Sequence, residues 1–250
     1  MQEVDQIEGR NPVLEALRAG RPLNKILVGH GMTGTLGQII AMARSARIPV
    51  VATDAAALDR MAKTRNHQGV IALTAPKDYA TLESILEGAR GSGRHPFILL
   101  LDGVMDPQNL GALIRTAEAM GFDGVVLPER RAAGLTATVS RASAGALEYI
   151  PVARVTNLTR AMAKMKEAGY WLIGAETGTG AHELPALDRP VGLVLGGEGQ
   201  GLHRLVREAC DFLVSIPQYG RVNSLNVSAA GAILMHALAA KNRPQPTRGK

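Results

Sequence analysis

The chain has 250 residues, of which 46% are apolar and 20% charged, so a packed core is expected and disorder throughout is not. Aromatic residues make up only 3%, which argues against RNA recognition by a platform of stacked rings. The net charge of +6 favours a polyanionic partner, but charge alone leaves binding of RNA or DNA open.

The first segment, residues 1–75, is interpreted as a small α/β domain. A helix is predicted over 11–20, because its apolar residues recur at helical spacing and Gly20 closes it. Short β-branched runs, with helical patterns between them, predict strands at 25–29, 48–53 and 69–75. Alternation of this kind indicates strands buried between helices.

Residues 76–94 differ in character from both neighbouring segments. They hold a charged amphipathic helical pattern followed by the Gly-Ser-Gly stretch at 91–93. We interpret 76–94 as a linker between domains. At the other end of the chain, residues 243–250 are rich in cations and proline and are predicted to form a basic tail.

The segment 95–242 again alternates between apolar runs and helical patterns. Strands are predicted at 97–104, 124–128, 171–176, 191–197 and 211–217. Helices are predicted at 109–120, 141–148, 158–168, 201–209 and 225–240. Five nearly continuous apolar strands separated by helices predict a parallel sheet that is covered on both faces.

Several common functional signatures are missing. The sequence has no phosphate-binding G-x-x-x-x-G-K-[ST] loop, no G-x-G-x-x-G after a strand and no G-x-S-x-G nucleophile turn. The six histidines have no metal-ligand spacing, so no metal site is expected. Hydrolase, P-loop nucleotidase and zinc-enzyme functions are therefore disfavoured.

The only cysteine, Cys210, excludes an internal disulfide and indicates a reducing compartment. It lies between a predicted helix and strand and is interpreted as a small buried filler. The first ten residues lack the apolar core of a signal peptide, and no apolar run approaches the roughly 18 residues that span a membrane. We expect a soluble cytoplasmic protein.

Polar residues follow three of the predicted strands, where ligands bind in open α/β sheets. After the first strand, Asn109 is placed to cap a helix, and Arg115 follows six residues later. The stretch 193–202 sets four glycines around Glu198, which is expected near the start of the next helix. Each pattern also has a plain structural interpretation: a capping Asn with a solvated Arg, and a flexible turn with a capping Glu.

The third stretch, 215–238, holds more helix-capping side chains than one helix needs. Ser224 and Asn226 precede an apolar helix, and Gly220 lies just before them. One such side chain is enough to satisfy the free N–H groups at a helix start. The surplus indicates that some of these groups bind something other than their own backbone.

Together, three stretches resemble the three motifs of the SpoU (TrmH) family of RNA ribose 2′-O-methyltransferases, in the SPOUT superfamily: DGVMDPQNLGALIRTAEAMGFDGVVLP, LVLGGEGQGL and IPQYGRVNSLNVSAAGAILMHAL. SRASAGALEYIPVARV, at 140–155, also resembles the family. Residues 7–29 and 66–75 resemble its substrate-binding domain, which is related to L7Ae-type RNA-binding proteins. Within the family the chain most resembles the bacterial 23S rRNA guanosine 2′-O-methyltransferases.

The resemblance implies a catalytic domain at 95–242 with a deep trefoil knot, an RNA substrate-binding domain at 1–75, and a homodimer built on the catalytic domains. It also implies S-adenosylmethionine as cofactor, bound at Ala175, Gly196, Gly197, Ile216 and Leu225. The positions that match the family's polar catalytic site are Asn109, Arg115, Glu198, Ser224 and Asn226.

The resemblance implies methylation of a ribose 2′-OH, most specifically of a guanosine in 23S rRNA. Arg115 is the family's candidate for removing the hydroxyl proton, but a guanidinium hardly deprotonates in proteins. We therefore prefer a clamping role for Arg115 and leave the base role open. The alternatives are a tRNA ribose methyltransferase and a non-catalytic RNA-binding assembly factor. A small-molecule methyltransferase fits poorly with the basic charge and the separate N-terminal domain.

Overall fold

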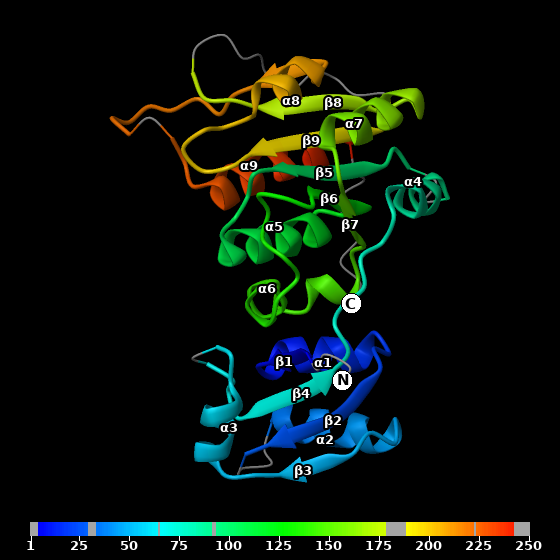
Figure 1. The fold of residues 1–250 in the computed structure, drawn as a ribbon, viewed down its shortest axis with the longest axis vertical. Helices are drawn as coiled ribbons and strands as arrows, with labels where there is room; N and C mark the ends of the chain where they lie inside the picture. The colour runs from blue at the N-terminus through cyan, green and yellow to red at the C-terminus, as the bar shows by residue number, and fades with distance from the viewer. Residues whose placement is uncertain are drawn as a thin grey trace.

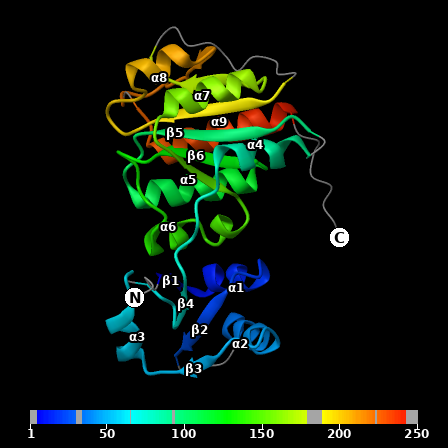
Figure 2. The same ribbon diagram turned by 45° about the vertical axis from the view of Figure 1, so that its right-hand side comes forward.

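The computed structural model describes residues 5–29, 34–64, 66–91, 94–178, 189–222 and 224–242. Two α/β domains are stacked along the long axis of the molecule, with the N-terminal domain at one end (Figures 1 and 2). The predicted basic tail at 243–250 lies outside the described residues. None of the helices in the described ranges is long and apolar enough to cross a membrane.

The N-terminal domain is built on a four-stranded mixed sheet in the order β1-β4-β2-β3. Strand β4 runs antiparallel to β1 and β2, and β3 runs parallel to β2. Its elements are β1 (Asp5–Glu8), α1 (Arg10–Arg18), β2 (Leu23–Val28), α2 (Thr35–Ser45), β3 (Val50–Ala52), α3 (Ala55–Met61) and β4 (Val70–Thr74). Strand β1, with the sequence DQIE, was not predicted, because one apolar residue among polar ones gives no strand pattern.

The C-terminal domain contains a six-stranded sheet in the order β10-β8-β9-β5-β6-β7, in which every pair of neighbours is parallel. The prediction of a parallel sheet is confirmed. Its strands are β5 (Phe97–Asp102), β6 (Gly124–Pro128), β7 (Val152–Val155), β8 (Trp171–Ala175), β9 (Val191–Gly196) and β10 (Phe212–Val214). Strand β7 was missed, because VARV is short and follows a proline.

Helices cover both faces of this sheet, as the alternating pattern predicted (Figure 1). One face packs against α4 (Leu82–Arg90), α7 (Leu158–Glu167) and α8 (Arg204–Ala209). The opposite face packs against α5 (Pro107–Ala119), α6 (Ala137–Ala142) and α9 (Val227–Asn242). Successive strand residues point to opposite faces, so both halves of the core are continuous and apolar.

The helix predicted over 141–148 is wrong in its bounds. Helix α6 ends at Ala142, and a short 3-10 turn follows at Ala146–Glu148. Between them Ala144 and Gly145 have positive φ angles, 51° and 98°, which a continuing helix cannot accommodate. Gly145 lies against the N-terminal domain, where an added Cβ would come 2.5 Å from the Cβ of Glu15.

The boundary of the predicted linker also needs correction. Helix α4 lies within 76–94, and its buried residues Leu82, Ile85 and Leu86 pack into the core of the C-terminal domain. The backbone N–H of Ala80 donates to the carbonyl of Val152. The connection between the domains is therefore short, and the predicted amphipathic helix belongs to the C-terminal domain.

A buried carboxylate joins the two domains. Glu148, at the end of the 3-10 turn, pairs with Arg21 at 2.7 Å and with Lys77 at 3.4 Å, and its side chain is only 3% exposed. Beside it, the Tyr149 hydroxyl donates to Glu15 of α1 at 2.6 Å, which raises the pKa of Tyr149 to about 12. The N-terminal domain is thus attached through charge pairs as well as through the chain.

We predict that Glu148→Ala destabilises the protein by about 3 kcal/mol, because Arg21 is left as an uncompensated cation with only 10% of its side chain exposed. The matched control is Glu208→Ala, which removes an exposed partner of Arg204 and is expected to cost less than about 1 kcal/mol. Urea-induced unfolding followed by circular dichroism measures both. Equal effects of the two substitutions would contradict a joining role for Glu148.

Candidate active site

The carboxyl ends of β8, β9 and β10 open into a cavity of about 590 Å³. Its wall is completed by the loop after β9 and by the start of α9. All five positions predicted to bind the cofactor line this one cavity: Ala175, Gly196, Gly197, Ile216 and Leu225. Three predicted polar positions line it as well: Glu198, Ser224 and Asn226.

Glycines allow the loop after β9 to fold back on the end of its own strand. A Cβ on Gly196 would clash with the backbone of Gly201, and one on Gly197 would clash with the carbonyl of Gly103. The loop closes with a hydrogen bond from Gly201 N–H to Gly197 O at 3.1 Å. Four glycines line this side of the cavity, so its wall there is backbone without side chains: Gly196, Gly197, Gly199 and Gly201.

Asn109, in the first motif, contacts both of the other motifs. Its side-chain Nδ2 donates to Oε1 of Glu198, and its Oδ1 accepts from Nδ2 of Asn226 at 3.1 Å. The prediction that Asn109 caps the helix is wrong. Asp106 caps α5 by accepting from Gln108 N–H, and Pro107 takes the first helical position. Asn109 is therefore free to use its buried amide across the site.

Asn226 is one of the several capping-type side chains that precede α9, and it does cap this helix. Its Oδ1 accepts from the backbone N–H of Ser228 at 2.9 Å and from the Ser228 hydroxyl at 2.6 Å. The opposite end of the same amide donates to Asn109. Ser224 is exposed and lines the cavity instead of capping the helix. The Asn226 side chain therefore caps α9 and also contacts the first motif, whereas Ser224 lines the cavity.

Glu198 does not lie at the start of the next helix, as had been predicted. Helix α8 begins at Arg204 with His203 as its cap residue, so the predicted start at 201 is too early. Glu198 belongs to the glycine loop, where its carboxylate receives Asn109 and, at 3.5 Å, Nδ2 of Asn226. The glycines around it permit this tight loop, which delays the helix.

Arg115 is not brought to this cavity. It lies six residues after Asn109 on α5, which places it about 9 Å along the helix and roughly 240° around it. Its side chain is exposed, and no hydrogen bond or ion pair of Arg115 occurs within the described ranges. The structure therefore gathers Asn109, Glu198, Asn226 and Ser224 at the cavity and leaves Arg115 on the surface.

An Asp–His pair beside the cavity was missed from the sequence. Asp102 ends strand β5 and is 6% exposed; its carboxylate accepts from the backbone N–H of His203 at 2.7 Å and pairs with His203 Nδ1 at 2.9 Å. The sequence held part of the signal for this pair. Asp102 ends the apolar run FILLL, and a carboxylate that is buried there needs a partner. Among the described residues, no cluster of His, Cys, Asp and Glu could hold a metal ion.

Comparison with known proteins supports the assignment of these motifs. A sequence profile of the SpoU rRNA methylase family matches residues 96–236, and a profile of RNA 2′-O ribose methyltransferase substrate-binding domains matches residues 6–80. The chain belongs to the SpoU rRNA methylase family. As a member of the SpoU family, it is an RNA methyltransferase.

Relatives within the SpoU family cover nearly the whole chain. A Bacillus subtilis protein named for the TrmH family of tRNA/rRNA methyltransferases is 42% identical over 97% of this chain and 98% of its own. A solved RNA 2′-O ribose methyltransferase is 26% identical with a TM-score of 0.77, covering 96% of this chain and 89% of its own. An AdoMet-bound rRNA methyltransferase from Sinorhizobium meliloti is 26% identical with a TM-score of 0.76, covering 93% and 85%.

These likenesses confirm the predicted α/β fold with its N-terminal substrate-binding domain. The trefoil knot and the closeness to 23S rRNA guanosine methyltransferases stay predictions.

The thiol of Cys210, the only cysteine in the sequence, is poorly reactive. Cys210 is about half-buried, and its thiol donates to the carbonyl of Val206 at 3.3 Å. Burial raises the pKa of Cys210 to about 12, so the thiol stays protonated at neutral pH. This agrees with its interpretation as a packing residue.

We predict that Cys210 in the folded protein reacts with iodoacetamide on the order of 100-fold more slowly at pH 8 than in urea, because the thiolate fraction falls as the pKa rises. The rate should still climb at pH 10, since the group titrates near 12. Mass-spectrometric timing of alkylation measures both rates, and the urea-unfolded chain is the control. Rapid labelling of the folded protein at pH 8 would contradict the raised pKa.

Proposed function

We propose that the protein transfers the methyl group of S-adenosylmethionine to a ribose 2′-OH of RNA, specifically to a guanosine of 23S rRNA, in the cytoplasm. The observation that carries this proposal is the convergence of the three motifs. All five predicted cofactor positions line one cavity, and Asn109, Glu198 and Asn226 form a hydrogen-bonded network at its edge.

The cavity fits the cofactor. Its volume of about 590 Å³ lies within the range of roughly 300–1,000 Å³ that small-molecule sites occupy. The bare backbone at Gly196 and Gly197 suits polar atoms that bind main-chain groups, and Ile216 and Leu225 offer apolar contact for a ring. When bound there, S-adenosylmethionine supplies an electrophilic methyl group.

The protein's own residues contribute alignment and electrostatics. Asn109 and Asn226 hold the Glu198 carboxylate at the rim of the cavity, and the Ser224 hydroxyl faces the same space. These groups orient the nucleotide whose 2′-OH is methylated. A ribose hydroxyl becomes a competent nucleophile only as its proton leaves, so a nearby cation that favours the alkoxide speeds the step.

Arg115 is the cation we assign to this role, although it faces away from the cavity of its own chain. Its guanidinium stays protonated and presents a planar fork to phosphate and ribose oxygens. We propose that Arg115, which is exposed on α5, reaches the cavity of a second subunit. The proposal requires the predicted homodimer through the catalytic domains, in which each cavity is completed by its partner.

The RNA is bound by both domains in this proposal. The net charge of +6 favours a polyanion, and residues 6–80 match the substrate-binding profile. The specific alternative is a tRNA ribose, because the Bacillus subtilis relative is named for both tRNA and rRNA. Mapping of ribose methylation by mass spectrometry, in rRNA and tRNA from cells with and without the gene, decides between them. If cells without the gene keep every ribose methyl group in both rRNA and tRNA, the proposal is refuted.

We predict that Gly196→Ala lowers the affinity for S-adenosylmethionine at least tenfold, because the added Cβ would clash with the Gly201 backbone that shapes the cavity. Gly220→Ala is the control, since nothing lies within 4 Å of its Cβ. Isothermal titration calorimetry measures both affinities, and circular dichroism checks that the variants are folded. Unchanged affinity in Gly196→Ala would show that the cofactor does not use this cavity.

We predict that Arg115→Ala lowers single-turnover methyl transfer by about 10²–10³-fold, while the affinity for S-adenosylmethionine stays the same. Arg115→Lys should restore little, because the planar fork is lost. Lys164→Ala, which removes a cation from the exposed last turn of α7, is the control.

Mixed dimers test whether the Arg115 that acts at a cavity comes from the same chain or from the partner. Chains carrying Arg115→Ala are mixed with chains carrying Gly196→Ala. If Arg115 serves the partner's cavity, about a quarter of the sites regain activity, because half of the random dimers are mixed and each has one complete site. No recovered activity would place Arg115 in its own chain's site or outside catalysis.

A further inference from the structure

A second cavity, of about 220 Å³, lies on the other side of the loop that follows β9. It opens at the carboxyl ends of β5 and β6, next to the starts of α7 and α8. None of its lining residues lines the 590 Å³ cavity. It is also smaller than the roughly 300–1,000 Å³ typical of small-molecule sites, so it suits one ring and not a whole cofactor.

The lining combines an apolar slot with a cationic rim. Leu158 and Val206 form buried parts of the slot, and Leu205 is 58% exposed beside them. Arg130 and Arg131 lie at the rim and are exposed, and neither has an acidic partner within the described ranges. An apolar slot flanked by two guanidinium groups without acidic partners in the described ranges matches a nucleobase between two phosphates.

The rim is held in place by a buried charge. Asp102 fixes the backbone and ring of His203, and Arg131 Nη1 lies 3.4 Å from Nε2 of that ring. Arginine can only donate, so Nε2 accepts and Nδ1 carries the proton toward Asp102. Arg131 also has a positive φ of 58°, which is uncommon for a residue other than glycine. A strained residue held by such a chain of contacts is often functional.

We infer that this second cavity is an accessory subsite for one nucleotide of the RNA substrate. Its base enters the apolar slot, and its flanking phosphates bind Arg130 and Arg131. The inference rests on the proposed function, because it takes the ligand to be RNA. A free phosphate would not need the apolar slot. A base does, and it also needs a flat group on which to stack. In a chain with 3% aromatic residues, the planes of Arg131 and His203 supply that partner.

One residue connects this subsite with the cofactor cavity. Asp102 orients His203 through its side chain, and its backbone carbonyl accepts from Gly197 N–H at 2.7 Å. Gly197 lines the larger cavity. A nucleotide in the subsite is therefore anchored directly beside the loop that shapes the catalytic cavity, which positions the neighbouring RNA strand.

Photo-crosslinking tests the location directly. The full-length protein is irradiated with a single-stranded RNA oligonucleotide containing 4-thiouridine, and the crosslinked peptides are identified by mass spectrometry. We expect crosslinks within residues 128–131 and 203–206. Crosslinks confined to the N-terminal domain and to the 590 Å³ cavity would overturn the subsite. The measurement needs no methyl transfer, and it uses the unaltered chain.

The variant Arg130→Ala/Arg131→Ala tests the energetics. We expect RNA affinity to fall at least tenfold, and the slope of log K against log salt to become shallower by about 1.4, as for two phosphate contacts on a single strand. The affinity for S-adenosylmethionine should not change. Leu205→Asp, at an exposed position, should weaken RNA binding by placing a negative charge in the slot.

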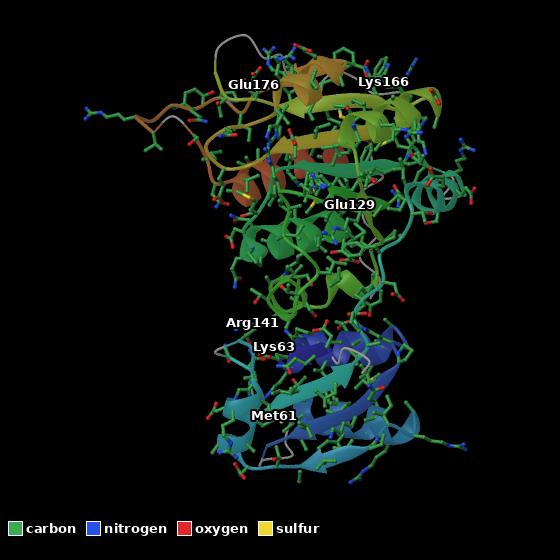
Figure 3. The ribbon with its side chains drawn as sticks, in the orientation of Figure 1. Met61, Lys63, Glu129, Arg141, Lys166 and Glu176 are labelled. Atoms are coloured by element: carbon green, nitrogen blue, oxygen red, sulfur yellow. The ribbon has the colours of Figure 1, made fainter. Side chains whose placement is uncertain are left out.

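The control is Lys164→Ala/Lys166→Ala, which removes the same charge at the other edge of the sheet; Figure 3 shows Lys166 at the opposite end of the strands from Glu176. It should lower RNA affinity less than threefold. If the unaltered protein methylates RNA and the arginine variant binds RNA as well as the control, the subsite is refuted and the proposed function stands. If the unaltered protein binds no RNA, both are refuted.

Discussion

The active cavity depends on two places where backbone packs against backbone without room for a side chain. At the end of β9, Gly196 lies against Gly201, and Gly197 lies against Gly103. These contacts fold the loop back on its strand and carry Glu198 toward Asn109. They also set the position of Asp102, whose carbonyl binds Gly197. A methyl group at either glycine would separate elements that the two cavities and the polar network share.

The sequence predicted those features that depend on neighbouring residues, and it missed those that depend on contacts between distant segments. The strands of the C-terminal sheet are continuous apolar runs, so their existence and parallel pairing followed from composition and order. Strands β1 and β7 carry little periodic signal and were missed. Helix α4 was expected, but its burial in the second domain depends on distant partners and could not be read from its own sequence.

The site shows the same division. Asp106 and Asn109 both have capping side chains within three residues, and local propensity does not tell which one caps and which one reaches across the sheet. The contact from Asn109 to Asn226 spans 117 residues, so only the resemblance to the SpoU family placed them together in advance. The same resemblance grouped Arg115 with the cavity, and the single chain leaves it on the surface because α5 turns it away. A single chain therefore brings the three motifs together without bringing Arg115 to the cavity that they form.

The buried Glu148 has a consequence for how RNA is selected. It pairs with Arg21 from one domain and Lys77 from the connection, while Gly145 sits against Glu15. Arg141 and Lys63 lie on the two sides of the same junction (Figure 3). The Arg21–Glu148 pair is nearly closed to water, with side chains 10% and 3% exposed, so separating the domains at this point would leave a buried charge unpaired. If RNA contacts both domains, as we propose, its contact points must match the spacing that this pair maintains, and the methylated ribose would be selected by its distance from the second contact as well as by its base.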